Sequence, residues 1–438
     1  MTGTFARTTE ERPAREESDR WLVLAVLTAV YAMNIADRFV ISTLIEPIKT
    51  EMQLSDGAIG LLTGAALAIF YVSAGIPLGI LADRANRKRM IAISLTAWSL
   101  LTSVCGMAQN FTQLLLARMG VGIGEAGGTP PSQSILADKF APRKRAFAMS
   151  LYAVGASLGA ALGASLGGHL NDLYGWRTTL IIFGLMGLPI ALLTLVFVRE
   201  PKRGLLDHDE PQSSASHSAS LRDTLVFIAG QRSLLHVLAG ATLVTLWGGG
   251  LVWWTPTYLL RAFDMSLGKS GELLGLMHGI VGGGLMLLTA WAMLRLANRP
   301  FRQQTWFVAI LTLITTIPSI LAYTTRSPEF SIMMMWLFVP TIYLYIGPTL
   351  ALAQNLVPAN MRSQTCAIIL FLANLANLAL APMLMGLMSD LIAVHAPGPG
   401  ESLRYVMIGC ALTGLWAAVH YICAARGLDQ DIRRAGTR

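Results

Sequence analysis

The chain has 438 residues, of which 54% are hydrophobic and 13% are charged, against roughly 25% charged residues in soluble domains. Its mean hydropathy is +0.55 and its formal net charge is +8. This composition excludes a disordered chain, a collagen and a disulfide scaffold, and it predicts a helical protein that crosses a membrane many times.

The first 20 residues are polar and mix arginine with glutamate, which predicts a cytoplasmic tail and not a cleavable signal peptide. Apolar stretches then recur, each about 20 to 30 residues long, enough to cross a hydrocarbon core of roughly 30 Å. We therefore expect an all-α integral membrane protein with twelve transmembrane helices. They cover residues 21–45, 57–82, 90–109, 111–135, 146–168, 176–198, 233–260, 271–294, 305–324, 330–355, 363–392 and 403–424.

The expected helices form two groups of six, within residues 21–198 and 233–424. Residues 199–232 are charged and serine-rich, which predicts a cytoplasmic linker with a short interfacial helix near LRDTLVFIAG. Residues 425–438 form a second tail. Lysine and arginine concentrate on the side of both tails, so both termini are expected in the cytoplasm, and the positive charge requires no nucleic-acid partner.

The two halves repeat weakly but in register. LADRANR at 81–87 corresponds to LANRPFR at 296–302, and Asp172 corresponds to Asp390 at nearly the same separation. Such spacing indicates a duplicated six-helix unit. Two such units joined by a cytoplasmic linker resemble the major facilitator superfamily over nearly the whole chain, and the resemblance implies two bundles that alternate access to a central site.

The string GILADRANRKR at 79–89 joins the second and third expected helices and resembles that family's signature loop. Its glycine allows a close approach of another helix, and its aspartate can accept hydrogen bonds at a helix end. The resemblance implies a cytoplasmic latch that stabilises the outward-open state, and a simple topology determinant is the alternative. The expected latch residues are Gly79, Asp83, Arg84, Arg87, Arg89, Asp138 and Arg145.

Asp37, Arg38, Arg118 and Glu125 lie inside expected membrane helices, where each charge costs several kcal/mol unless it is paired or hydrated. Helix geometry places Asp37 and Arg118 at similar depth, and Glu125 two turns from Arg118 on the same face. A buried carboxyl group beside an arginine can change partner when it binds a proton. We therefore expect Asp37 and Glu125 to bind protons, with Arg118 as counter-ion and Arg38 as counter-ion or anion ligand.

These charges occur in the first half alone. The corresponding positions of the second half are Trp254, Thr255, Met335 and Ile342. A fixed structural salt-bridge cluster remains the alternative interpretation, but a scaffold requirement shared by both halves does not explain the four charges.

NIADR at 34–38 and GIGEAGGTPPS at 122–132 resemble the N-x-x-D-R and G-x-G-E-A-x-x-x-P elements of spinster-like transporters, which include lysophospholipid and sphingosine-1-phosphate carriers. The resemblance implies an amphipathic, lipid-like substrate, moved with protons in some members. Aromatic and methionine residues of the second half suit an apolar tail, with ordinary packing as the alternative. The expected cavity residues are Tyr31, Asn34, Arg38, Arg118, Glu125, Trp254, Tyr343, Phe371, Asn374 and Asn377.

No constellation of nucleophile and base indicates an enzyme, and the four cysteines lack metal-ligand spacing, so no cofactor or metal is expected. The sequence predicts a monomeric, multi-pass protein of the cell membrane, expected to be a bacterial inner membrane, in contact with membrane lipid. Its predicted activity is proton-coupled transport of a lipid-like substrate. A proton-coupled carrier of small organic anions or drugs, and a membrane ligand sensor that does not transport, remain alternatives.

Overall fold

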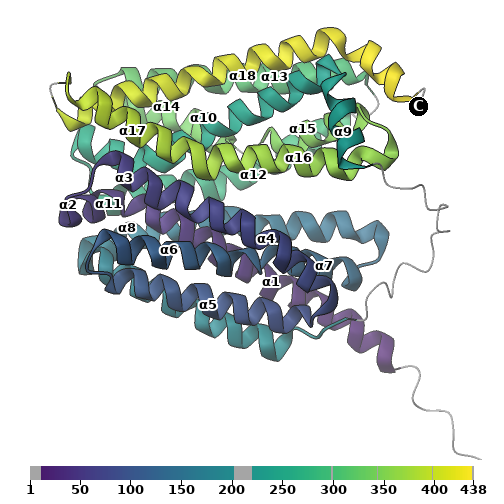
Figure 1. Cartoon of the computed structure of the whole chain (residues 1–438), viewed down its shortest axis with the longest axis horizontal. Helices are drawn as coiled ribbons and strands as arrows, with labels where there is room; N and C mark the ends of the chain where they lie inside the picture. Colours follow the sequence, from purple (N-terminus) through teal and green to yellow (C-terminus); the bar gives the residue numbers. More distant parts are fainter. Residues whose placement is uncertain (1–10, 202–219, 297–298, 343, 397, 437–438) are drawn as a thin grey trace, which may run out of the picture. The chain divides into compact units, whose positions relative to one another are not determined.

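The computed structural model describes residues 11–201, 220–296, 299–342, 344–396 and 398–436. All regular elements among these residues are helical (Figure 1). Ten helices in the described part are long and apolar enough to cross a membrane. The predicted all-helical class is therefore confirmed.

Apart from the stretch between Phe197 and Leu221, the α-helices follow one another with short connections. They are α1 (Glu11–Thr43), α2 (Ile45–Met52), α3 (Asp56–Gly60), α4 (Ala66–Arg84), α5 (Arg87–Met107), α6 (Phe111–Ala126), α7 (Thr129–Lys139), α8 (Pro142–Phe197), α9 (Leu221–Ala229), α10 (Arg232–Phe263), α11 (Leu267–Leu276), α12 (Gly283–Leu296), α13 (Phe301–Thr324), α14 (Pro328–Phe338), α15 (Ile346–Asn355), α16 (Arg362–Asn374), α17 (Ala381–Ala393) and α18 (Pro399–Gly436). Short 3-10 segments occur at Val339–Thr341 and Ala359–Met361.

Three of the expected helices need a closer description. The 56-residue α8 contains the non-helical Gly175, whose φ of 76° favours glycine, so the chain changes direction between the expected helices 146–168 and 176–198. The expected helix 111–135 is divided into α6 and α7 at Gly127 and Gly128. Neither α6 nor α7 alone has the length of a membrane span.

Three π-helical segments lie within the long helices, at Leu61–Ala65, Met277–Gly282 and Leu375–Leu380. The first and the third pack against each other. This approach needs a small residue, because a Cβ atom on Gly64 would lie 2.9 Å from the carbonyl oxygen of Leu378. Such π-turns are frequent at functional sites.

One compact unit comprises residues 1–37, 70–159 and 177–211. Within it, α5 and α6 pack side by side (Figure 1). Glycines permit the close helix contacts of this unit. A Cβ atom on Gly124 would lie 2.9 Å from that of Trp98, and one on Gly159 would lie 2.3 Å from the carbonyl oxygen of Ala32.

A second compact unit comprises residues 38–69, 160–176 and 212–438. In it, α18 packs against both α10 and α13. A cluster that includes Leu234, Leu356 and Leu428 forms an apolar core where α9, α10, α15, α16 and α18 meet. Contacts thus group residues 38–69 and 160–176 with the second half of the chain, although they precede the linker.

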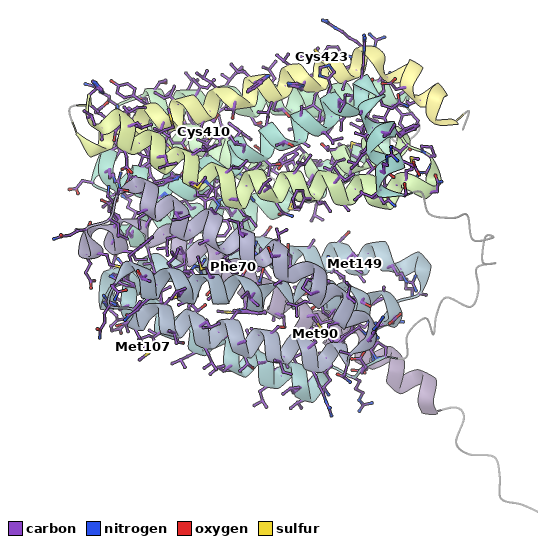
Figure 2. All side chains as sticks on the ribbon, in the orientation of Figure 1. Phe70, Met90, Met107, Met149, Cys410 and Cys423 are labelled. Atoms are coloured by element: carbon purple, nitrogen blue, oxygen red, sulfur yellow. The ribbon has the colours of Figure 1, made fainter. Side chains whose placement is uncertain are left out.

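The ends of the chain and the linker differ in detail from the expectation. Helix α1 begins at Glu11, so part of the expected tail 1–20 is helical. Helix α9 confirms a short helix where one was expected inside the linker, and residues 202–219 of that linker lie outside the described part. In Figure 2, Cys410 and Cys423 lie apart along α18. Cys410 is buried and Cys423 is partly exposed.

Candidate functional site

An ion pair between α1 and α6 lies in the interior of the first unit. Asp37 on α1 and Arg118 on α6 are 1% and 0% exposed, and Arg118 Nη1 lies 3.1 Å from Asp37 Oδ2. The Thr102 hydroxyl on α5 donates to Asp37 Oδ1 at 2.7 Å. Both oxygens of the carboxylate therefore have donors from two further helices, which fixes the position of the carboxylate.

The guanidinium of Arg118 retains donors that this pair does not use. Its Nε and Nη2 atoms are buried and make no hydrogen bond with any of the described residues. The same holds for the side-chain nitrogen of Asn34, one turn before Asp37 on α1. Because buried N–H groups without acceptors are costly, these atoms are suited to an anionic or carbonyl group of a ligand.

Glu125 lies near the end of α6 and is fully buried. Glycines allow this part of the helix to lie against α5, since a Cβ atom on Gly127 would lie 2.1 Å from the Ser94 hydroxyl oxygen. Helix α6 ends at Ala126, one residue after Glu125. The carbonyl oxygen of Glu125 accepts a hydrogen bond from the backbone N–H of Gly128 at 3.2 Å. A buried carboxyl group therefore stands at a break in the helix.

The remaining predicted residues of α1 have different surroundings. Tyr31 stacks on Tyr152, with ring centroids 4.8 Å apart and an interplanar angle of 14°. Arg38 is 9% exposed and belongs to the second compact unit. The structure therefore brings Asp37 together with Arg118, while Arg38 is grouped elsewhere.

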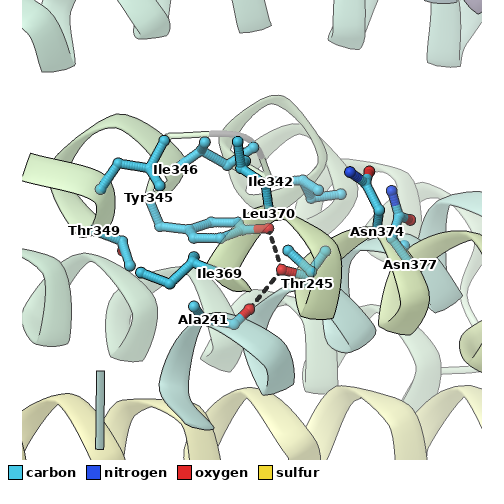
Figure 3. A pocket seen from close by; sticks show the side chains of 13 residues that line it. Ala241, Thr245, Ile342, Tyr345, Ile346, Thr349, Ile369, Leu370, Asn374 and Asn377 are labelled. Atoms are coloured by element: carbon cyan, nitrogen blue, oxygen red, sulfur yellow. Dashed lines mark hydrogen bonds between the residues drawn. The ribbon is translucent and has the colours of Figure 1, made fainter. Parts of the chain in front are cut away.

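The second unit contains a small pocket between α10, α15 and α16 and the π-helical segment that follows α16 (Figure 3). Its volume is about 70 Å³, and its wall is mainly aliphatic. Tyr345 donates from its hydroxyl to Thr245 at 2.7 Å, and Thr245 donates to the carbonyl oxygen of Ala241 at 2.5 Å. Asn374 and Asn377 lie together at one end of the pocket.

The other cavity residues predicted in the second half lie elsewhere. Trp254 is fully buried and donates to the carbonyl oxygen of Pro382 at 3.2 Å, an ordinary packing position. Phe371 is 48% exposed and is not among the residues that line the pocket. Tyr343 lies outside the described residues. Sequence reasoning missed Thr245, because a threonine in a membrane helix carries no distinctive signal.

The predicted latch centres on Arg87 at the start of α5. This arginine is 1% exposed and bonds Asp138 at 2.5 Å, Glu200 at 2.7 Å and the hydroxyl of Ser134 at 2.8 Å. Glu200 also accepts from the backbone N–H of Lys88 at 2.9 Å. Sequence reasoning missed Glu200, whose position beyond the last helix of the first half gave no sign of this partner.

The other predicted latch residues are less closely joined. Arg145 donates to the carbonyl oxygens of Ala137 and Phe140, at 2.8 and 3.1 Å, and so fixes the turn before α8. The side chains of Arg84 and Arg89 are exposed, and that of Asp83 lies outside the described part. Among the described residues of its own unit, no heavy atom lies within 4 Å of a Cβ placed on Gly79, so this conformation gives no packing reason for that glycine.

Comparison with known proteins gives one consistent result. A family model described as the Major Facilitator Superfamily matches residues 27–382. An MFS-type efflux pump of Mycolicibacterium smegmatis is 31% identical over 411 residues, which cover 93% of each chain. Protein spinster homolog 1 of Xenopus laevis is 26% identical over 447 residues, which cover 94% of this chain and 82% of the relative.

A solved structure extends this similarity to the fold. It is a bacterial homolog of the human lysosomal transporter Spinster in an inward-facing and unoccupied conformation. The TM-score is 0.83 at 27% sequence identity, covering 94% of this chain and 98% of the other. The occupied form of that homolog gives a TM-score of 0.79.

Proposed function

Because the chain belongs to the major facilitator superfamily and is a spinster-like, multi-pass membrane transporter, we propose that it moves an amphipathic, lipid-like substrate by proton-coupled alternating access. The proposed substrate is of the lysophospholipid or sphingoid phosphate type. The observation that carries this proposal is the buried Asp37–Arg118 pair, with a second fully buried acid, Glu125, on α6. Members of this family are transporters and not enzymes.

The proposed topology has twelve membrane spans and two cytoplasmic termini. It counts α8 as two spans that meet at Gly175, and α6 with α7 as one interrupted span. The proposed bundles are residues 21–198 and 233–424, and the protein is proposed to act as a monomer in the cell membrane. The unequal distribution of lysine and arginine between the two sides supports this orientation.

The proposed coupling uses exchange of partners at Arg118. A proton on Asp37 removes the negative charge that holds the guanidinium, so an anionic head group of the substrate can take its place. The Nε and Nη2 atoms of Arg118 carry three further N–H donors, which add bonds for that head group. One charge crossing 100 mV supplies about 2.3 kcal/mol, enough for roughly a fifty-fold gradient of substrate.

The proposed tail site is the pocket beside Tyr345. Its aliphatic wall accepts methylene groups, while Asn374 and Asn377 mark a polar end. Arg87, with Asp138 and Glu200, is proposed as the cytoplasmic latch that stabilises the outward-open state. A simple topology determinant remains the alternative for that loop.

Flux measurements in proteoliposomes test the proposed function. The purified chain is reconstituted, a proton gradient is applied, and movement of labelled lysophospholipids and sphingoid phosphates is followed. Substrate movement that requires the gradient and increases with its size supports the proposal. Binding without any movement would contradict it and would indicate a ligand sensor.

A carrier of drugs or small organic anions is the second candidate, and the similarity to an efflux pump favours it. The two candidates differ in how they respond to chain length. For a lipid carrier, competition strengthens as the acyl or sphingoid chain grows at constant head group. For the second candidate, short anions or drugs compete as well as the long-chain compounds.

A further inference from the structure

In the second unit, α17 crosses α3 in very close contact. A Cβ atom on Gly386 would lie 2.2 Å from the carbonyl oxygen of Asp56. One turn later, the carboxylate of Asp390 accepts from the backbone N–H groups of Asp56 and Gly57 at 2.9 and 2.7 Å. The carboxylate thereby satisfies N–H groups at the start of a helix, where negative charge is favourable.

The same arrangement occurs where α8 crosses α11. A Cβ atom on Gly168 would lie 2.2 Å from the carbonyl oxygen of Leu267. The carboxylate of Asp172 accepts from the backbone N–H of Gly268 at 2.9 Å. Gly168 and Asp172 correspond in the internal repeat to Gly386 and Asp390 of the first crossing. The two crossings are therefore equivalent copies within the internal repeat.

At the start of the capped helix, the first copy has Asp56 where the second has Leu267. Asp56 is 3% exposed and holds an ion cluster. Arg261 on α10 binds its carboxylate with two N–H groups, at 2.8 and 2.7 Å, and Lys49 on α2 adds a contact at 2.6 Å. Leu267 carries no charge that could hold such a cluster.

The cluster ties four helices together. Arg261 also donates to Glu46 on α2 at 2.8 Å, and the hydroxyl of Ser389 on α17 donates to Asp56 at 2.6 Å. Bidentate bonds between arginine and carboxylate are among the strongest hydrogen bonds in proteins. Removal of one member leaves a buried charge without compensation, which destabilises this packing.

Asp56 begins α3, which continues through the π-helical segment Leu61–Ala65 into α4, and α4 ends at Arg84 beside the proposed cytoplasmic loop. On the proposed topology, the cluster therefore faces the outer side. We propose that Arg261 and Asp56 form the lock of an outer gate, which holds α2 and α3 against α10 and α17 while the outer side is closed. The crossing at Asp172 lacks this ion cluster, and its cap bond to Gly268 adds little to the contact. This inference rests on the proposed alternating access.

Distances between two spin labels test the lock without any substrate. Cysteines replace Thr50 on α2 and Val394 after α17, both of which are exposed, in a chain whose four native cysteines are replaced by alanine. Pulsed electron paramagnetic resonance then gives the distance distribution in proteoliposomes. The matched variants are Asp56→Leu, which copies the second crossing, Arg261→Gln, and Asp172→Asn as the control.

Asp56→Leu and Arg261→Gln are expected to raise the ratio of long to short distances about tenfold or more, because each removes charge-assisted bonds. Asp172→Asn is expected to change that ratio by a smaller factor. Unchanged distributions in both lock variants would overturn the proposal, as would a larger change in Asp172→Asn. Arg261→Lys keeps the charge and loses the bidentate geometry, so its ratio of long to short distances is expected to lie between those of the wild type and Arg261→Gln. A wild-type distribution in Arg261→Lys would also count against the lock.

This readout separates the lock from the proposed function. It needs neither a substrate nor a proton gradient. If the protein carries another substrate, the lock variants still show the shift in distance. If the proposed lock is wrong but the proposed function is right, Arg261→Gln still transports the lipid substrate.

Discussion

Arg118 Nη1 and Asp37 Oδ2 lie 3.1 Å apart between two helices that are distant in sequence, and the side chains are 0% and 1% exposed. Thr102 completes the surroundings of the carboxylate. An ion pair without contact with water is costly to form, and breaking it by removal of one partner is costly as well. The pair is therefore suited to a change in which another anionic group replaces Asp37 as the partner of Arg118.

Asp37→Asn is expected to abolish the pH dependence of transport and to destabilise the fold by about 3–5 kcal/mol, because Arg118 remains buried without its counter-ion. Uptake measured from acidic to alkaline pH, together with thermal unfolding, checks both parts. The double variant Asp37→Asn/Arg118→Gln serves as the control for stability. The double variant is expected to be more stable than Asp37→Asn. If uptake by Asp37→Asn still depends on pH, Asp37 is not the group whose protonation drives transport.

Thr102→Val removes one donor to the Asp37 carboxylate and keeps the shape of the side chain. The expected loss is about 1.5–3 kcal/mol in the free energy of unfolding, since the lost bond is to a charged group. Thr96→Val on the same helix is the matched control, because the Thr96 hydroxyl bonds the carbonyl oxygen of Ala92 one turn earlier. Equal losses in the two variants would show that Thr102 has no special part in the site.

Arg87→Ala is expected to lower the transport rate at least tenfold, because it leaves Asp138 and Glu200 without their shared partner. Arg89→Ala, two residues further along the same helix and exposed, is expected to stay near the wild-type rate. Initial rates in proteoliposomes at equal protein content measure the difference. If both variants transport equally, the loop acts as a topology determinant and not as a latch.

Gly175→Ala is expected to destabilise the protein by about 1–3 kcal/mol, because a φ of 76° with a ψ of 164° is a conformation that essentially only glycine adopts. No atom of the described residues lies within 4 Å of the Cβ position, so the cost comes from the backbone alone. Gly284→Ala, in a helix with open space at its Cβ, is expected to be neutral or slightly stabilising. Thermal unfolding of both variants provides the comparison, and a neutral Gly175→Ala would argue against a required turn there.

Ala241→Phe is expected to fill the pocket beside Tyr345 and to raise the KM of long-chain substrates at least tenfold, with little effect on short-chain analogues that have the same head group. The short-chain analogues are the internal control. A uniform rise of KM across the series would indicate damage to the head-group site or to the fold, and no change would exclude the pocket as the tail site.

Local patterns were sufficient for the main class of the fold. Hydropathy and segment length predicted membrane helices, because spanning a hydrocarbon layer constrains every residue of a segment. The charges Asp37, Arg118 and Glu125 could be identified for the same reason, since charged residues are rare in membrane helices. The correspondence of Asp172 with Asp390 could likewise be identified from the sequence.

Partners across helices were decided by packing alone. Sequence spacing predicted Arg118 as the counter-ion and left open whether Arg38 is a second counter-ion or an anion ligand, because rotation of one helix against another depends on all side chains between them. Glu200 was missed because it lies beyond the last helix of the first half, and Thr245 because a threonine in a membrane helix carries no distinctive signal. The role of Asp172 and Asp390 also came from the folded chain, in which each carboxylate caps a helix that belongs to the other repeat. The repeat can be recognised along the sequence. The exchange of helix caps between the two repeats exists only in the folded protein, because it depends on how the helices pack against each other.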